Sequence, residues 1–189
     1  RAEVLTPDDL MAGARPSGKR VVLYDDDHFY MGGVLAELLA REDYQVTLVT
    51  PAADVSNWTA NTLEQGFIQT RLLELGIEIR PHHSVAAMRA DAAVAASVFT
   101  GRKREIEADA LVLVTARLPD DRLYLDLKAR EADWADAGIK SVKVIGDACA
   151  PGPIAYAVYA GHRYARELDV PDIGDAVPFK RELTELAEF

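Results

Sequence analysis

The chain has 189 residues, of which 49% are hydrophobic and 7% aromatic, so it has enough apolar material for one core, or for one core and part of a second. Its 31 acidic and 21 basic residues give a net charge of -10, which disfavours nucleic acid as a partner because phosphate contacts need clustered lysine and arginine. No apolar run approaches the roughly 20 residues that cross a bilayer, so we expect no membrane association and a cytoplasmic location.

Residues 1–18 are polar and contain glycine and proline, a composition typical of a linker. Because the chain also starts at Arg1 and not at methionine, we expect it to be the C-terminal part of a longer protein whose upstream part precedes this linker.

A β-α-β unit follows the linker. The apolar run at residues 21–24 predicts a strand that is buried on both faces, as in a parallel sheet. Gly32 and Gly33 open a stretch with apolar residues at helical spacing, and the β-branched segment at 45–50 predicts the next strand.

The middle of the chain continues this alternation and then changes period. Asn61 and Glu64 have the spacing of a capping box, and Gly76 suits the end of the helix that they open. A strand is predicted at 77–80. Three short strands joined by turns then predict a β-meander, at residues 84–88, 93–100 and 103–108.

The last predicted elements are a buried strand, a helix, a strand that ends in Gly146-Asp147, and a helix entered at Pro151 and Pro153. Their residues are 111–115 for the first strand, 123–137 for the first helix and 142–145 for the second strand. The order of elements predicts an α/β fold, a Rossmann-like nucleotide-binding domain with a parallel sheet, helices on both faces and a three-stranded β-meander crossover. The domain boundaries that we predict are 19–140 for an NAD(P)-binding-like small domain, 141–170 for the return segment of an FAD/ADP-binding-like domain, and 171–189 for a C-terminal tail.

The turn after the first strand departs from the dinucleotide-binding pattern. In G-x-G-x-x-G the glycines let the backbone approach the pyrophosphate, but here Asp25, Asp27 and Tyr30 occupy those positions. The second strand ends in Thr50, where an NAD site has an acidic residue for the ribose. Two separate requirements for NAD therefore fail.

Two features of this turn have more than one interpretation. Gly32 and Gly33 either let a ligand approach or, as we favour, allow close packing of the helix. The three consecutive acids at 25–27 form either a solvated loop, which we favour, or a contact for a cation or partner protein.

No spacing of a catalytic triad, paired catalytic carboxylates or metal ligands is found, so we predict no catalytic residue and no metal site. Cys149 is the only cysteine; we interpret it as a small buried residue, and alone it cannot hold an iron–sulfur cluster. His82 and His83 would point to opposite faces of a strand, and we interpret His162 as a surface or interface residue.

Four segments together resemble the trimethylamine and dimethylamine dehydrogenase group of the NADH:flavin oxidoreductase family, which includes old yellow enzyme-like proteins. They are YDDDHFYMGGVLAELLA (24–40), WTANTLEQ (58–65), LVLVTARLP (111–119) and VIGDACAPGPIAYAVYAGHRYARELD (144–169). The resemblance extends from Thr6 to Arg181, which is nearly the whole chain.

The resemblance implies a barrel domain with FMN and a 4Fe-4S cluster in the upstream part of the chain, and electron transfer to an electron-transferring flavoprotein. It also implies a homo-oligomer when the protein is full length. No cofactor is assigned with certainty to this part of the chain, although an ADP or FAD-like nucleotide is compatible with it.

Gly146, Asp147 and Ala148 match the motif that contacts the cofactor in FAD-binding relatives, where the carboxylate accepts hydrogen bonds from ribityl hydroxyls. In the amine dehydrogenases that the chain resembles, ADP is expected in place of FAD, so Asp147 would lack this partner. A structural role for Asp147 in a turn or helix cap is an equal alternative.

From these residues and this resemblance, we predict the C-terminal nucleotide-fold region of a flavin-dependent, amine dehydrogenase-like oxidoreductase. This region is expected to be accessory or ADP-associated and catalytically incomplete. The alternatives are a working NAD(P)H domain of a 2,4-dienoyl-CoA reductase-like flavoenzyme, with Gly32 and Gly33 in the phosphate loop, and an acidic docking module for a redox partner.

Overall fold

The computed structural model describes residues 3–168, which form two compact units, one ending at Arg117 and the other beginning at Leu118. This division falls earlier in the chain than the boundary that we predicted at residue 140. The predictions for residues 1–2 and 169–189, including the C-terminal tail, lie outside the described residues. Within 3–168, no helix has both the length and the apolar character needed to span a bilayer.

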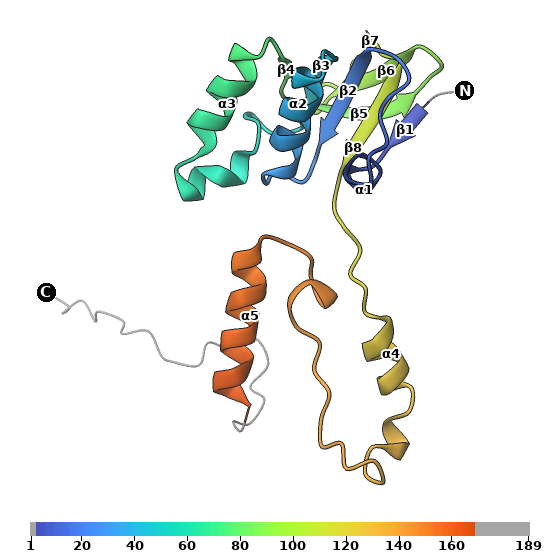
Figure 1. Ribbon diagram of the computed structural model, residues 1–189, viewed down its shortest axis with the longest axis vertical. Helices are drawn as coiled ribbons and strands as arrows, with labels where there is room; N and C mark the ends of the chain where they lie inside the picture. The colour runs from blue at the N-terminus through green and yellow to red at the C-terminus, as the bar shows by residue number, and fades with distance from the viewer. Residues whose placement is uncertain (1–2, 169–189) are drawn as a thin grey trace, which may run out of the picture. The chain divides into compact units, whose positions relative to one another are not determined.

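The first unit contains a five-stranded sheet in the order β1-β8-β2-β3-β4, and all of its neighbouring strands are parallel (Figure 1). The strands are β1 (Glu3–Leu5), β2 (Arg20–Asp25), β3 (Gln45–Val49), β4 (Glu78–Arg80) and β8 (Ala110–Val114). The apolar runs predicted a strand at each of the last four. The mixed α/β class with a parallel sheet is therefore confirmed.

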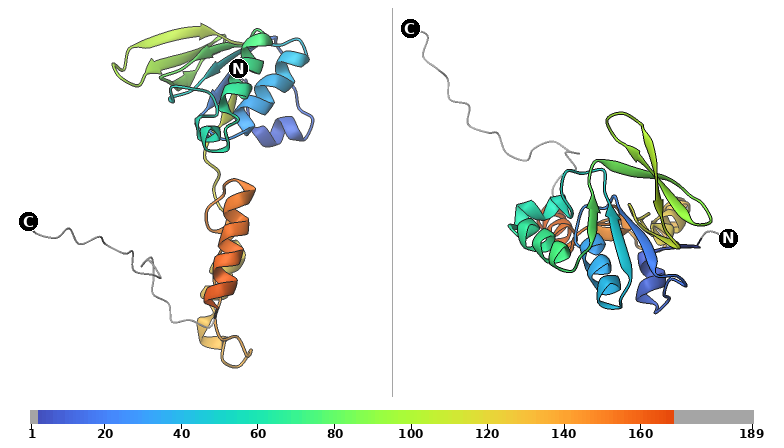
Figure 2. Two further views of the ribbon diagram at one scale, coloured as in Figure 1. Left: turned by 90° about the vertical axis from the view of Figure 1, so that its left-hand side faces the viewer. Right: turned by 90° about the horizontal axis from the view of Figure 1, so that it is seen from above.

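The two faces of this sheet are covered by different structures, because successive side chains of a strand point to opposite sides. Val21 and Leu23 of β2 pack with the helices, whereas Val22 and Tyr24 pack with the meander. The helices are α1 (Pro7–Met11), α2 (Met31–Arg41) and α3 (Gln65–Glu74), and the meander strands are β5 (His83–Met88), β6 (Ala92–Ser97) and β7 (Lys103–Glu107) (Figure 2). The predicted β-meander is confirmed.

The prediction of helices on both faces is wrong for this unit. The meander takes the place of a second helical layer, since Ala93 of β6 is fully buried in the same cluster as Val22 and Leu111 of the parallel sheet. The chain therefore crosses from β4 to β8 through three antiparallel strands and not through a helix.

The second helix begins later than predicted. Residues Asn57–Thr62 form a 3₁₀ helix, and Leu63 then takes a left-handed backbone conformation with φ of 63°, so the α-helix α3 begins only at Gln65. Leu63 and Phe67 are 84% and 80% exposed, whereas Leu72 is buried against α2. The capping box that we expected at Asn61 is therefore absent from this helix.

The opening residues are part of the first unit, which corrects the prediction of a linker at 1–18 for residues 3–11. Strand β1 pairs with β8, and the helix α1 buries Leu10 in the core. Thr6 and Asp9 form a reciprocal cap, in which Thr6 Oγ1 accepts from the Asp9 N–H at 3.2 Å and Asp9 Oδ2 accepts from the Thr6 N–H at 2.8 Å.

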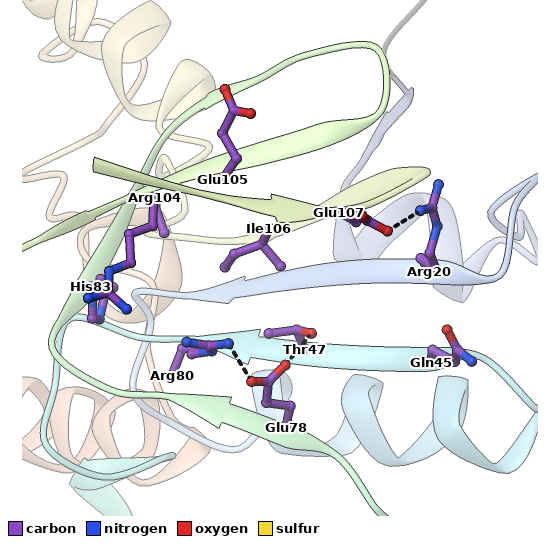
Figure 3. A pocket seen from close by; sticks show the side chains of 11 residues that line it. Arg20, Gln45, Thr47, Glu78, Arg80, His83, Arg104, Glu105, Ile106 and Glu107 are labelled. Atoms are coloured by element: carbon purple, nitrogen blue, oxygen red, sulfur yellow. Dashed lines mark hydrogen bonds and ion pairs between the residues drawn. The ribbon is translucent and has the colours of Figure 1, made fainter. Parts of the chain in front are cut away.

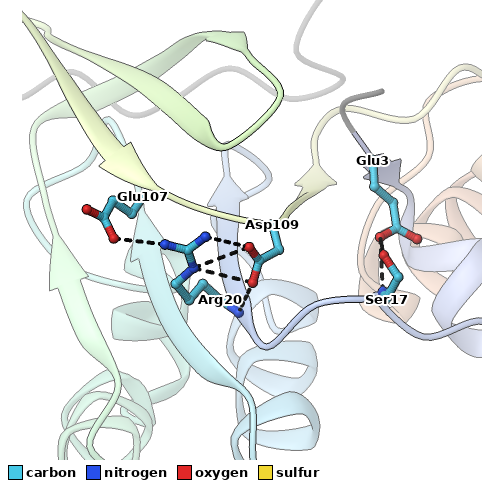
Figure 4. Close-up of polar contacts among 5 residues, drawn as sticks. All are labelled: Glu3, Ser17, Arg20, Glu107 and Asp109. Carbon is cyan, nitrogen blue, oxygen red and sulfur yellow. Dashed lines mark hydrogen bonds and ion pairs between the residues drawn. The ribbon is translucent and has the colours of Figure 1, made fainter.

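Arg20 joins the start of β2 to the segment between β7 and β8 (Figure 4). Its Nη2 donates to Asp109 Oδ1 at 2.6 Å, and its Nη1 donates to Glu107 Oε2 at 2.8 Å. Gly18 makes this arrangement possible, since a Cβ at that position would lie 2.3 Å from the Asp109 Cβ. The same view shows that Glu3 accepts two hydrogen bonds from Ser17, which fastens β1 to the segment before β2.

These hydrogen bonds lower the pKa of Asp109 from 3.8 to about 2, because Arg20 donates to the ionised carboxylate through its side chain and its backbone. The ionised form is therefore favoured in the folded state. The stability that it contributes is present above pH 3.8 and is lost as the pH falls towards about 2. We expect wild-type protein to lose stability relative to Asp109→Asn over this window, as measured by urea unfolding at stepwise pH. A difference that does not change with pH would show that the ionisation of Asp109 contributes nothing to stability.

The second unit contains α4 (Arg122–Lys128), the 3₁₀ helices at Glu131–Asp133 and Gly146–Ala148, and α5 (Ile154–Glu167). None of these helices buries a residue, and Ile154 and Tyr159 are 84% and 68% exposed. The last helix is confirmed, and the helix predicted at 123–137 is shorter than expected. The prediction of a strand at 142–145 is wrong for the described residues. A strand needs a neighbouring strand for its backbone hydrogen bonds, and residues 118–168 contain no strand.

Candidate functional site

The candidate site is the loop between β2 and α2, at the carboxyl edge of the parallel sheet, where α/β proteins bind ligands. Asp25, the last residue of β2, is fully buried. Its Oδ1 accepts hydrogen bonds from the backbone N–H groups of Asp27 and His28, both at 3.2 Å. The Asp25 side chain at the end of β2 therefore uses backbone donors of the loop that follows it.

The second oxygen of this carboxyl group has a different environment. Asp25 Oδ2 is buried without a hydrogen-bond partner among the described residues. Burial raises the pKa of Asp25 above its usual value, and the hydrogen bonds from His28 and Asp27 offset only part of that effect. The site thus contains a desolvated carboxyl group that is held by one oxygen.

Gly32 in the first turn of α2 lies directly against this carboxyl group. A Cβ on Gly32 would lie 2.4 Å from the Asp25 Cγ and 2.6 Å from Oδ2, closer than any side chain tolerates. A Cβ on Gly33 would lie 3.1 Å from the Ile68 Cγ2 of α3 and 3.4 Å from the Ser56 Oγ. Both glycines therefore provide close packing, Gly32 for Asp25 and Gly33 for α3.

The third glycine position of the usual pattern is held by Tyr30, which precedes α2 and is 36% exposed. Its hydroxyl donates to Glu64 Oε2 at 2.5 Å and lies 3.1 Å from Thr62 Oγ1. The side chain is thus directed to the loop before α3. The neighbouring Phe29 packs edge-on against Trp58, with ring centroids 5.1 Å apart.

The ribose position at the end of β3 has no carboxylate. Thr50 is fully buried, and its Oγ1 accepts from the Ala52 N–H at 3.3 Å. Its own N–H donates to the Arg80 carbonyl at 3.1 Å. Thr50, which replaces the ribose-binding acid, therefore forms its hydrogen bonds with neighbouring backbone groups.

The three consecutive acids do not form one solvated loop, which corrects the interpretation that we favoured. Asp25 is buried, whereas the Asp26 side chain is 46% exposed and lies 3.5 Å from His28 Nε2. Burial raises the pKa of Asp27, and the positive charge of Arg117 opposes that effect. Only part of the predicted charge therefore reaches the surface.

The second unit contains the other predicted site, Gly146, Asp147 and Ala148. Gly146 has a φ of 62° and lies against Ala157 of α5, since its Cβ would be 3.7 Å from the Ala157 Cβ. Asp147 is exposed, and its Oδ1 accepts from the Gly152 N–H at 3.4 Å. This contact spans the turn before α5, as a structural role predicts, and the rest of the carboxylate is open to a ligand.

Cys149 and His162 of the second unit are both exposed. Cys149 is exposed, so the expectation of a buried cysteine is wrong for the described residues, because this unit has no core to cover it. His162 is exposed, in keeping with a surface residue. Within 3–168, no three His, Cys, Asp or Glu side chains converge as ligands for a metal ion.

The sequence did not indicate a cleft of about 460 Å³ between the parallel sheet and the meander (Figure 3). Its residues come from the starts of β2 and β3, from β4 and from the meander strands, and they are largely charged. It is lined by Arg20, Gln45, Thr47, Glu78, Arg80, His83, Ala95, Arg104, Glu105, Ile106 and Glu107. The signal that could have identified it is the run of charged residues at 103–107, which Ile106 alone interrupts.

The sheet, its helical layer and the meander define a mixed α/β domain. At the carboxyl edge of its sheet, the Asp25 side chain accepts hydrogen bonds from the backbone of the loop that follows β2. The model of the OYE-like second alpha/beta domain matches residues 5–107. The chain belongs to this family.

The same chain is 34% identical to dimethylamine dehydrogenase of Hyphomicrobium sp. (strain x), over 95% of this chain and 27% of that protein. Among solved structures, histamine dehydrogenase from Rhizobium sp. 4-9 is 57% identical with a TM-score of 0.89, covering 99% of this chain and 29% of its own. The 6-hydroxypseudooxynicotine amine oxidase from Pseudomonas geniculata N1 is 42% identical with a TM-score of 0.76, covering 85% and 24%. The chain is thus homologous to one region of much longer amine-oxidising enzymes.

Proposed function

We propose that this chain is the Rossmann-like, accessory region of a flavin-dependent amine dehydrogenase-like oxidoreductase, and that its loop between β2 and α2 does not bind NAD(P)H. The observation that carries the proposal is the buried Asp25 carboxyl group, which accepts hydrogen bonds from the N–H groups of Asp27 and His28.

The electrostatics of the loop support this proposal. A pyrophosphate bound at the start of a helix needs free backbone N–H groups and open space beside them, and nearby carboxylates repel it. Here an internal carboxyl group already lies against Gly32 in the first turn of α2. Asp26 and Asp27 add two further carboxyl groups in the next positions of the loop.

The end of β3 supports the proposal independently. An NAD site uses a carboxylate there to accept hydrogen bonds from the ribose hydroxyls. Thr50 is buried and hydrogen-bonded within its own turn. Neither the phosphate nor the ribose of NAD would therefore find its usual partner.

The chemistry of the whole protein is proposed from the relatives. The chain spans only 27% of the dimethylamine dehydrogenase that it matches, so amine oxidation would take place in other parts of the full-length protein. We place FMN and a 4Fe-4S cluster there, in keeping with the presence of a single cysteine in this chain. When bound, these groups would supply electron transfer from the amine. We propose an electron-transferring flavoprotein as the acceptor, an upstream barrel in the same chain and a homo-oligomeric full-length protein.

Any nucleotide role of this chain would lie at Gly146, Asp147 and Ala148. The exposed carboxylate of Asp147 is able to accept hydrogen bonds from hydroxyl groups, which fits the ribose of ADP or the ribityl chain of FAD. These three residues supply no cationic group for phosphates, so other residues would have to complete the pocket.

Two other functions are less well supported by the same loop. A working NAD(P)H domain would need Gly32 and Gly33 to face the ligand, but Asp25, Ile68 and Ser56 lie against them. An acidic docking module would present all three carboxylates of 25–27, but Asp25 is buried.

The test is anaerobic reduction of the flavin in the full-length protein, followed by its visible absorbance. We expect dimethylamine or histamine, the amines in the relatives' names, to bleach the flavin, and we expect NADH and NADPH to leave it oxidised. Reduction by NADH or NADPH would overturn the proposal for the loop, whereas failure of both amines would overturn the proposal for the substrate class.

A further inference from the structure

The cleft between the parallel sheet and the meander is lined by an arginine that forms no ion pair with the acids of the cleft. It lies on the face of β3 opposite the helices, because Thr47 lines it while Val46 and Leu48 pack in the helical core. Its volume of about 460 Å³ is in the range of small-molecule sites.

Each acid that lines the cleft already has an arginine partner. Glu107 pairs with Arg20 at 2.8 Å, Glu78 pairs with Arg80 at 2.6 Å, and Glu105 pairs with Arg89, which lies outside the cleft. The negative charge of the lining is therefore compensated by these pairs.

One arginine of the lining has no such compensation. Among residues 3–168, the guanidinium of Arg104 makes no ion pair or side-chain hydrogen bond. Figure 3 shows its side chain extending from β7 towards His83 at the start of β5. A planar guanidinium with five N–H donors is thus available to a ligand at this end of the cleft.

Arg80, at the end of β4, supplies a second donor. Its Nη2 is paired with Glu78, but its Nε is buried and has no acceptor among the described residues. A buried donor without a partner is rare in folded proteins and indicates a missing acceptor.

His83 completes this end of the cleft. Its Nδ1 lies 2.7 Å from the Pro81 carbonyl, which is only an acceptor, so Nδ1 donates this hydrogen bond. Three side chains from three different strands therefore line the same end of one cleft.

We propose that this cleft binds a small molecule through an oxyanion, a phosphate or carboxylate group, held by the guanidinium groups of Arg104 and Arg80 beside His83. The remainder of the ligand would occupy the part of the cleft lined by Thr47 and Ile106. This site is separate from the loop between β2 and α2, and it does not rest on the function proposed for that loop.

Isothermal titration calorimetry of the 189-residue chain with inorganic phosphate and, separately, with citrate at constant ionic strength tests the proposal. Binding of either probe is expected, and the tighter one identifies a phosphate or a carboxylate as the preferred group. Arg104→Gln is expected to weaken binding by about tenfold, the usual effect of losing one charge-assisted hydrogen bond.

Arg102→Gln is the matched control, because it removes the same charge from an exposed residue that does not line the cleft. Arg80→Lys tests the geometry, since it retains the charge and removes Nε; it should also weaken binding, and circular dichroism checks that each variant is folded. The proposal is overturned if neither probe binds wild-type protein, or if Arg102→Gln weakens binding as much as Arg104→Gln.

Discussion

Gly32→Ala is expected to lower the free energy of unfolding by about 1–3 kcal/mol, the usual cost of forcing a methyl group into a filled space. The added Cβ would lie 2.4 Å from the Asp25 Cγ, and the carboxyl group is fully buried, so it has no solvent-filled space to move into. Urea unfolding of the purified chain, followed by circular dichroism, measures the change.

A double-mutant cycle shows whether Asp25 is the cause. In the background of Asp25→Ala the same glycine substitution should cost less, because the Cγ and Oδ2 that it meets at 2.4 Å and 2.6 Å are gone and only the Cβ at 2.8 Å remains. Gly66→Ala is the matched control; Gly66 is in the first turn of α3 with nothing within 4 Å of its Cβ, so alanine there should be neutral or stabilise by up to about 1 kcal/mol. Equal costs of Gly32→Ala with and without Asp25 would contradict the packing that we describe.

Asp25→Asn is expected to gain stability relative to wild type as the pH rises above 3.8. Burial raises the pKa of Asp25 above that value, so the folded state favours the protonated carboxyl group. The stability that this protonated group contributes is fully present below pH 3.8 and is lost as the pH rises through the folded pKa. Asparagine retains the Oδ1 acceptor and never ionises.

The measurement is urea unfolding of both proteins from acid to neutral pH, analysed as the difference between them. Asp109 titrates in the opposite direction, but both proteins contain it and its effect cancels from the difference. A difference that is constant with pH, or one that moves in favour of wild type as the pH rises, would show that the carboxyl group is not desolvated.

Most strands of the first unit could be predicted from the sequence, because a strand buried on both faces reads as a continuous apolar run, as at Val21 to Tyr24. The opening strand β1 has only three residues and was missed. The helix after it had a readable signal, since Thr6 and Asp9 have capping spacing with Pro7 at the first helical position.

The strand predicted at 142–145 is a case in which the sequence pattern predicts a strand that the structure does not form. Its sequence, Val142 to Ile145, has β-branched residues, but a strand forms only against a neighbouring strand. Whether that neighbour exists depends on residues far away in the chain, which the local pattern does not contain.

The candidate site could be predicted only in part. The sequence showed that acids replace the glycines at 25 and 27, and we expected the loop to lack the requirements of an NAD site. It did not show that Asp25 turns inward onto Gly32, because the direction of a side chain at the end of a strand depends on the packing of the helix that follows.

We propose that the Asp25 carboxyl group occupies the loop between β2 and α2 and that this loop is not a dinucleotide site. Anaerobic mixing of the full-length protein with NADH and NADPH, followed by flavin absorbance, tests this proposal. We predict that the flavin stays oxidised with both nucleotides and is reduced by an amine. Flavin reduction by either nucleotide would contradict it.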